Sequence, residues 1–390
     1  MEPGVSEAPP PIQEKDAPKR SPGGRRIRLL IDGLHSKSGG GVTYLRNMLP
    51  LLADDEGIDL HLCIQDDQRH LLPANAEKIT LHVLPFHFSF WRLHFWEQFS
   101  LPRLARRIGA NVTFSPANYG PFFAPNPIIL IGNAISVALV ERRPTKLIYW
   151  AAVYLGTVLS LIRCRRVLAV SDYARRSVAD TLPRRFRRET TVVHHGVDPL
   201  FRPPAADRER ENFLLAVSDV YVQKNLGNLL LAIARLRPYH PDVSLKIAGR
   251  FIDKDYLASL RQIMDAHGLA PHVEFLGHVE PQGLVELYQR CRIFVFPSLV
   301  ETFGIPLIEA MACGAPIASS NTAAMPEVLG DAGLYFDPTD VDGIAVAINR
   351  LIRDPALRRG FSDRARTRAA GFSWETAAAR TLAVIRNAAP

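Results

Sequence analysis

The stretch from residue 293 to residue 337 constrains the fold of this chain most, because it contains a buried strand, a loop, a helix and a second strand in succession. The apolar run 293–296 is typical of a parallel strand, and Pro297 ends it. Pro306 suits the first turn of the helix, where its missing N–H is no loss. Gly314 is expected just past the end of that helix. The stretch therefore predicts an open parallel sheet covered by helices.

Two carboxylates, Glu301 and Glu309, lie on either side of the predicted turn between strand and helix. Ligands of open parallel sheets bind at such turns, and the N-terminus of a helix attracts anions. Carboxylates accept hydrogen bonds from sugar hydroxyls. The pair therefore indicates a ligand that carries a phosphate and several hydroxyls. Alternatively, Glu301 is a solvated loop acid and Glu309 a partner of the helix dipole.

The sequence around this pair is PS-x-x-E-x-FG-x-P-x-x-EAMA-x-G-x-P, followed by PEV-x-GDAG-x-YFDP. It closely resembles the E-x7-E donor-site signature of retaining glycosyltransferases of family 4, which have the GT-B fold. The resemblance implies an α/β protein with two Rossmann-like domains, whose parallel sheets face a cleft. It also implies that Glu301 holds hydroxyls of the donor sugar and Glu309 the nucleotide ribose. Phe303, Gly304 and Ile305 are then expected beside the donor sugar or its phosphates.

The length of 390 residues and the hydrophobic share of 47% suffice for two domain-sized cores. Residues 1–25, rich in proline and charge, are expected to form a disordered tail and not a signal peptide. We expect the remaining chain to form an N-terminal domain, a linker and a C-terminal domain (26–200, 201–211 and 212–372). The family resemblance implies that a last helix, within 373–390, returns to the N-terminal domain.

The N-terminal domain opens with a predicted strand, residues 27–31, a loop with Gly39, Gly40 and Gly41, and a helix. The G-x-G-x-x-G spacing of dinucleotide-binding proteins is missing, so an oxidoreductase is not favoured. The family resemblance implies that the three glycines approach the donor diphosphate and the acceptor. Alternatively, they form a flexible turn.

A second loop of this domain departs from the resembling family. A predicted strand, residues 128–131, is followed by Gly132 and Asn133. Family members usually carry a histidine at the position of Gly132, facing the reaction centre. We expect Asn133 to take over part of its role.

In the C-terminal domain, Lys224 is expected at the start of a helix, where the helix dipole disfavours a cation. This placement favours pairing with a phosphate, and the resemblance implies that Lys224 binds the donor diphosphate. Alternatively, Lys224 is an exposed surface lysine. Ser218 stands near the place of an arginine that many members carry. Arg250 and His278 follow two predicted strands and resemble the family's nucleobase pocket.

Basic residues are concentrated between residues 92 and 188, with 16 Lys and Arg against four acids. This charge indicates an anionic partner, such as a phospholipid surface, a phosphorylated lipid acceptor or nucleic acid. Aromatic and arginine residues alternate within 86–107, as in a membrane-interface segment; packing into the N-terminal core is the alternative. The chain shows none of the patterns of nucleic-acid-binding modules, so we expect no nucleic-acid partner. The apolar run 147–162 is too short to span a bilayer.

The sequence offers no pattern of metal ligands. The four cysteines lack Cys-x-x-Cys or Cys/His spacing and fit a reduced, cytosolic setting. The D-x-D triplet at residues 253–255 is expected to begin a helix as its cap. We therefore expect neither a metal nor a cofactor.

The family resemblance implies a retaining glycosyltransferase that moves a hexose from a nucleotide-diphospho-sugar, with GDP-mannose as first candidate and a UDP-sugar as the other. The expected acceptor is a hydroxyl of a glycan or lipid-linked glycan in surface polysaccharide or glycolipid synthesis. The expected place is the cytoplasm, with a peripheral position at the inner face of the plasma membrane as the second option. The alternatives are a catalytically silent nucleotide-sugar- or membrane-binding module, and a nucleotide-sugar isomerase.

Overall fold

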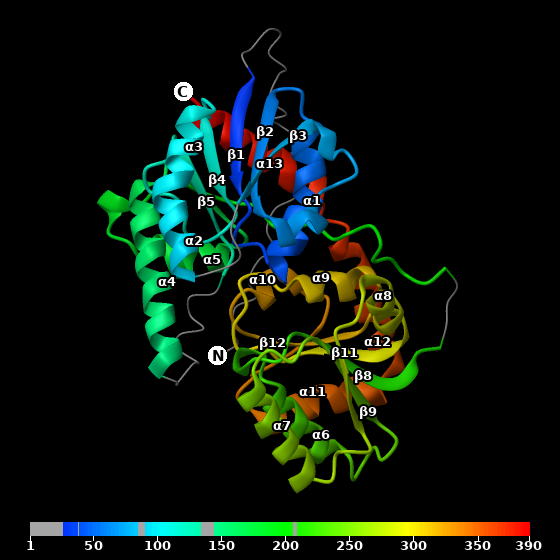
Figure 1. Cartoon of the computed structure of the whole chain (residues 1–390). Coiled ribbons are helices and arrows are strands. Elements are labelled where there is room, and N and C mark those ends of the chain that lie inside the picture. Colours follow the sequence, from blue (N-terminus) through cyan, green and yellow to red (C-terminus); the bar gives the residue numbers. More distant parts are fainter. Residues whose placement is uncertain (1–25, 38, 85–89, 134–143, 206–208) are drawn as a thin grey trace.

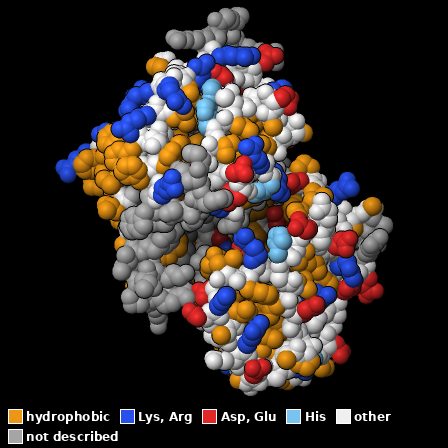
Figure 2. All heavy atoms as spheres, in the orientation of Figure 1, with side chains coloured by type: hydrophobic (Ala, Val, Ile, Leu, Met, Phe, Trp, Pro, Cys, Tyr) orange, Lys and Arg blue, Asp and Glu red, His pale blue; other side chains and the backbone are white. Residues whose placement is uncertain are grey.

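The computed structural model describes residues 26–37, 39–84, 90–133, 144–205 and 209–390. The predicted disordered tail and part of the segment 86–107 lie outside these residues. The described chain forms two α/β domains, the N-terminal one above the C-terminal one in Figure 1, with a groove between them that Figure 2 shows.

The N-terminal domain is built on a seven-stranded parallel sheet in the order β3-β2-β1-β4-β5-β6-β7. Its strands are β1 Ile27–Asp32, β2 Ile58–Gln65, β3 Ile79–Leu84, β4 Val112–Ser115, β5 Pro127–Ile131, β6 Arg166–Ala169 and β7 Thr190–Val192. The helices are α1 Gly40–Ala53, α2 Phe90–Phe95, α3 Leu101–Arg107, α4 Pro144–Arg163, α5 Asp172–Val178 and the last helix of the chain, α13 Trp374–Ala388.

The C-terminal domain repeats this plan with six parallel strands in the order β10-β9-β8-β11-β12-β13. Its strands are β8 Glu211–Val217, β9 Ser244–Ala248, β10 Val273–Gly277, β11 Cys291–Phe296, β12 Ile317–Ser320 and β13 Leu334–Phe336. The helices are α6 Leu226–Leu236, α7 Lys254–Ala266, α8 Pro281–Arg290, α9 Ile305–Ala312, α10 Met325–Leu329, α11 Val341–Arg353 and α12 Pro355–Ala369. In both sheets the strand order reverses beside the first strand, which is where ligands of such sheets bind.

One expectation about the strands was wrong. The alternation of residues 58–64 predicted a strand with one polar face, but His61, Cys63 and Gln65 are buried as well as the apolar residues of β2. The reason is that both faces of this parallel sheet are covered: Leu62 packs in the same cluster as Leu45 of α1, and Cys63 in the same cluster as Leu101 of α3.

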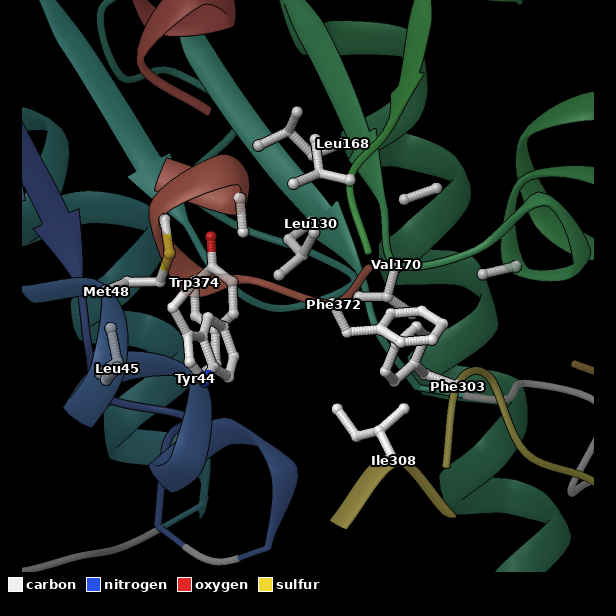
Figure 3. Packing of buried hydrophobic residues seen from close by; sticks show 14 of the residues in the cluster. Tyr44, Leu45, Met48, Leu130, Leu168, Val170, Phe303, Ile308, Phe372 and Trp374 are labelled. Atoms are coloured by element: carbon white, nitrogen blue, oxygen red, sulfur yellow. The ribbon is translucent and has the colours of Figure 1, made fainter. Parts of the chain in front are cut away.

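A continuous apolar core joins the two domains. One cluster of buried residues contains Leu168 and Val170 of the N-terminal domain together with Phe303 and Ile308 of the C-terminal domain, as Figure 3 shows. The chain crosses between the domains at Gly196 and again just before Trp374. A Cβ atom on Gly196 would lie 2.2 Å from the backbone nitrogen of Trp374, so only glycine permits this approach.

Candidate active site

The predicted strand, loop and helix around the two carboxylates are present as β11, the loop 297–304 and α9. Gly304 begins α9 with a φ of 90°, a left-handed conformation that favours glycine. Pro306 lies in the first turn, and Gly314 follows the helix with a φ of 68°. The loop therefore lies at the carboxyl end of β11, next to the point where the strand order reverses.

Glu301 of this loop forms an ion pair with Lys224 from a second loop, which follows β8. The Nζ atom of Lys224 lies 2.6 Å from Oε1 of Glu301, and both side chains are largely shielded from solvent. Lys224 ends a short 3₁₀ turn, which Asn225 fixes by donating from Nδ2 to the carbonyls of Pro297 and Pro338. The two residues expected to contact the donor sugar and its diphosphate are thus side by side.

Glu309 has a different environment, which the sequence did not indicate. The phenol of the buried Tyr288, on α8, donates to Oε2 of Glu309 over 3.0 Å. Burial raises the pKa of Glu309 to about 7, although the hydrogen bond from Tyr288 opposes the rise. Glu309 is therefore a carboxyl that can carry a proton near neutral pH.

The glycine-rich loop of the N-terminal domain lies against the first turn of α9. Gly39 precedes α1 with a φ of 57°, and a Cβ atom on Gly40 would lie 3.5 Å from Cδ1 of Ile305. The ring of Phe303 is buried 5.0 Å from that of His195. Of the three glycines, Gly40 thus lies next to the first residue of α9.

Gly132, which replaces the family's usual histidine, lies at the contact between the domains. Its carbonyl accepts a hydrogen bond of 2.6 Å from the hydroxyl of Thr302, the neighbour of Glu301. Asn118 holds the following turn, because its Oδ1 accepts from the amides of Gly132 and Asn133. Asn133 itself is exposed beside this contact.

The remaining predicted residues lie at the ends of β8, β9 and β10. The guanidinium of Arg250 is held by Asp219, with Nη2 and Oδ2 2.6 Å apart. A Cβ atom on Gly249 would lie 1.9 Å from the carbonyl oxygen of Ser218, so the two strand ends touch. His278, directly after β10, is exposed, and its Nε2 lies 3.3 Å from Oε1 of Glu280. The D-x-D triplet caps a helix as predicted, since Asp253 accepts from the amide of Tyr256.

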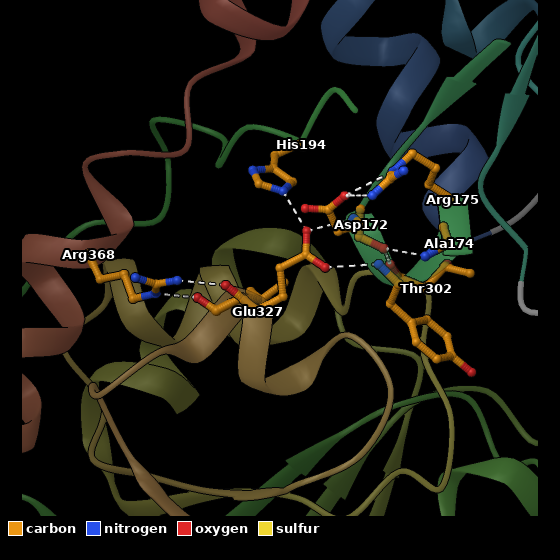
Figure 4. A network of polar contacts seen from close by, with 10 residues as sticks. Asp172, Ala174, Arg175, His194, Thr302, Glu327 and Arg368 are labelled. Carbon is orange, nitrogen blue, oxygen red and sulfur yellow. Dashed lines mark hydrogen bonds and ion pairs between the residues drawn. The ribbon is translucent and has the colours of Figure 1, made fainter. Parts of the chain in front are cut away.

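A carboxylate that the sequence analysis missed fastens the two domains together. Glu327, on α10 of the C-terminal domain, accepts hydrogen bonds from the amides of Asp172 and Tyr173 over 2.7 and 3.0 Å. It also lies 2.8 Å from Nε2 of His194, as Figure 4 shows. Burial alone would raise the pKa of Glu327, but these hydrogen bonds outweigh burial and lower it. We call Glu327 and its three partners the interdomain clasp.

The sequence analysis also missed a cluster of titratable side chains at the end of β1 and in the loop that follows it. Asp32, His35 and Glu97 place their polar atoms within 4.8 Å of one another. Burial, and then the charge of Glu97, raise the pKa of Asp32 to about 7. Burial would lower the pKa of His35, but the carboxylate of Glu97 outweighs it and raises the pKa to about 9. The contact between Nε2 of His35 and Oε2 of Glu97, 3.1 Å apart, ties the loop after β1 to the segment that carries Glu97.

Comparison with known proteins gives matches over both domains. Residues 198–368 match the family model of glycosyl transferases group 1. The O-antigen chain mannosyltransferase B of Escherichia coli is 32% identical over 243 residues, 57% of this chain and 61% of that protein. A glycogen synthase of Mycobacterium tuberculosis is 33% identical over 201 residues, 50% of this chain and 48% of that protein. Anabaena HepE, solved in complex with UDP-glucose, superposes with a TM-score of 0.74 at 18% identity over 93% of this chain and 100% of that one.

The two facing parallel-sheet domains and this superposition define a protein of the GT-B fold, as the sequence predicted. Residues 198–368 belong to the group 1 glycosyltransferase family. The chain spans about half to three fifths of the length of the curated relatives it matches, 48% and 61% in the two cases given.

Proposed function

We propose that this protein is a retaining glycosyltransferase that takes a hexose from a nucleotide-diphospho-sugar. The observation that carries the proposal is the Lys224–Glu301 pair at the N-terminus of α9, with Glu309 on the same helix. The cation and the helix dipole suit a diphosphate, and the two carboxyl groups suit the hydroxyls of a sugar and a ribose.

In this proposal the protein acts mainly by positioning and by charge. Lys224 stabilises the departing diphosphate, so the donor site needs no metal ion. Glu301 orients the donor sugar, and Glu309 binds the ribose. Asn133, beside the Thr302–Gly132 contact, faces the acceptor side. Contact between the domains excludes water from the donor and so suppresses its hydrolysis.

GDP-mannose is the first candidate donor, and a UDP-sugar is the second. The name of the E. coli relative supports mannose, and the UDP-glucose bound to HepE supports the wider class. The proposed acceptor is a hydroxyl of a glycan or lipid-linked glycan in surface polysaccharide or glycolipid synthesis. Arg250 and His278 line the proposed nucleobase side, and Ser218 lies on the side of the diphosphate.

We further propose a peripheral contact of the N-terminal domain with an anionic membrane on the cytoplasmic side. Phe95, Phe99 and Phe123 expose 65%, 47% and 55% of their surface, and Arg106 donates to the carbonyl of Phe123. Aromatic rings beside arginines suit a membrane interface. Among the residues that the structure describes, no helix is long and apolar enough to cross a membrane.

The test is a transfer assay with radiolabelled GDP-mannose or UDP-glucose and a panel of glycan and lipid-linked acceptors. A labelled product whose new bond keeps the donor's anomeric configuration by NMR supports the proposal. Donor binding without transfer to any acceptor favours a silent binding module. A changed sugar released without an acceptor favours an isomerase.

A further inference from the structure

A hollow lined by arginines lies on the N-terminal domain, away from the groove. It has a volume of about 450 Å³, which is enough for a small ligand. Its charged lining consists of five arginines and one carboxylate: Arg163, Arg165, Arg166, Arg187, Arg188 and Glu189. The hollow therefore carries a strong local excess of positive charge.

The partners of these arginines do little to neutralise them. Arg166 lies 3.4 Å from Glu189, whose side chain is 70% exposed. Arg188 donates to the carbonyl of Ile162 over 2.6 Å, which orients its guanidinium but leaves its charge uncompensated. Arg163 stacks over the ring of Phe123, 5.2 Å from its centre. The hollow thus presents partly oriented cations with one carboxylate among them.

The hollow and the proposed donor site lie at opposite ends of the same strands. Pro127 and Arg166, the first residues of β5 and β6, line the hollow. Gly132 and Ser171, which follow the same strands, hydrogen-bond to Thr302 of the donor loop. Five residues of strand separate the two ends by roughly 15 Å.

We propose that this arginine hollow is a binding site for a phosphate-bearing anion, separate from the donor site. Guanidinium groups bind phosphate oxygens through paired, charge-assisted hydrogen bonds, and several together suit a phosphate monoester or a diphosphate. The anion is either a free phosphorylated molecule or the headgroup of a phospholipid. Figure 2 shows the basic side chains of this domain next to a hydrophobic patch, a combination that both sources allow.

The first test is calorimetric titration of the full chain with inorganic pyrophosphate in a Lys224→Ala background, which removes the lysine of the donor site. Arg163→Gln with Arg165→Gln is expected to weaken binding about tenfold or more, because two charge-assisted contacts are lost. The matched control is Arg353→Gln with Arg359→Gln, which removes two exposed arginines of the C-terminal domain. An equal loss in both double variants, or no pyrophosphate binding at all, overturns the proposal.

The second test separates the two sources of phosphate. The same variants are sedimented with phosphatidylcholine vesicles with and without phosphatidate. If the source is lipid, phosphatidate-dependent sedimentation falls only in the Arg163/Arg165 variant. If it is a free molecule, sedimentation is equal in both variants while pyrophosphate affinity still differs. Stabilisation by a nucleotide-sugar should be unchanged in the Arg163/Arg165 variant with Lys224 intact, so this proposal and the proposed function can fail independently.

Discussion

At the scale of single residues, the two carboxyl groups of the donor motif differ in their partners. Glu301 faces the ammonium of Lys224 at 2.6 Å, whereas Glu309 faces the phenol of Tyr288. A nearby cation stabilises a carboxylate, and burial without a cation stabilises the protonated acid. The same motif therefore places one carboxyl group beside a cation and the other against a neutral phenol.

Glu309 gives a prediction about stability and pH. Its pKa is raised by burial from 4.5 to about 7 in the folded protein, so the folded state binds the proton more tightly than the unfolded state. This contribution to stability is present at low pH and is lost as the pH rises through about 7. We expect the Tm of Glu309→Gln relative to wild type to increase between pH 5 and pH 8, measured by calorimetry. The control is Glu286→Gln on the exposed face of α8, and a pH-independent difference for Glu309→Gln contradicts the prediction.

The sequence located Glu301, Lys224 and Glu309 because each belongs to a local pattern with a fixed relation to a strand end or a helix start. It could not locate Tyr288 or Glu327. Tyr288 reaches Glu309 from another helix, and Glu327 meets amides 155 and 154 residues away in the chain. Such pairs depend on how helices and domains pack, which no local spacing records.

At the scale of elements, the turn at Gly304 that begins α9 positions Glu301 and Glu309 relative to each other. Gly304 has a φ of 90°, and a Cβ atom there would lie 3.2 Å from the ring of Phe296. Gly304→Ala should therefore destabilise the protein by about 1–2 kcal/mol and weaken nucleotide-sugar binding.

Chemical denaturation and calorimetric titration measure these two effects. Gly360→Ala is the control, because Gly360 lies inside α12, its Cβ atom would make only ordinary contacts, and alanine favours a helix. If Gly304→Ala is as stable as wild type, the account of this turn is wrong.

The sequence predicted the strands at 27–31, 128–131 and 293–296, which are β1, β5 and β11, because apolar runs of four to eight residues bounded by turns are distinctive. It did not predict that both faces of β2 are buried, because His61 and Gln65 are polar residues that are nevertheless buried in the folded protein. It also gave no prediction for α12, whose sequence is rich in arginine and poor in apolar residues.

At the scale of the whole molecule, α10 connects the interdomain clasp with the loop that carries Glu301. Arg368 of α12 holds the carbonyls of Glu327 and Val328, so α10 is fixed to its own domain. The amide of Ala324, just before α10, donates to the carbonyl of Glu301. Opening of the domains would therefore also disturb the loop that carries Glu301.

Removal of the clasp should loosen the contact between the domains. We expect Glu327→Ala to broaden and lengthen the distance between spin labels at Asp67→Cys and Asp342→Cys, measured by pulsed EPR. These side chains are 68% and 74% exposed, and the four native cysteines are buried. Asp331→Ala, which removes an exposed acid just after α10, should leave the distance unchanged. An unchanged distance in Glu327→Ala would show that the apolar core and the hydrogen bonds of Thr302 hold the domains together without the clasp.

The central claim is that the site formed by Glu301 and Lys224 binds a nucleotide-diphospho-sugar. Calorimetric titration tests this claim most directly. We expect one of GDP-mannose and UDP-glucose to bind wild type, and Lys224→Ala to weaken that binding about tenfold or more, because a charged hydrogen bond contributes about 1.5–3 kcal/mol. Lys254→Ala, which removes an exposed lysine at the start of α7, should leave the affinity unchanged. Absence of binding by any nucleotide-sugar, or an equal affinity of Lys224→Ala and wild type, would contradict the account.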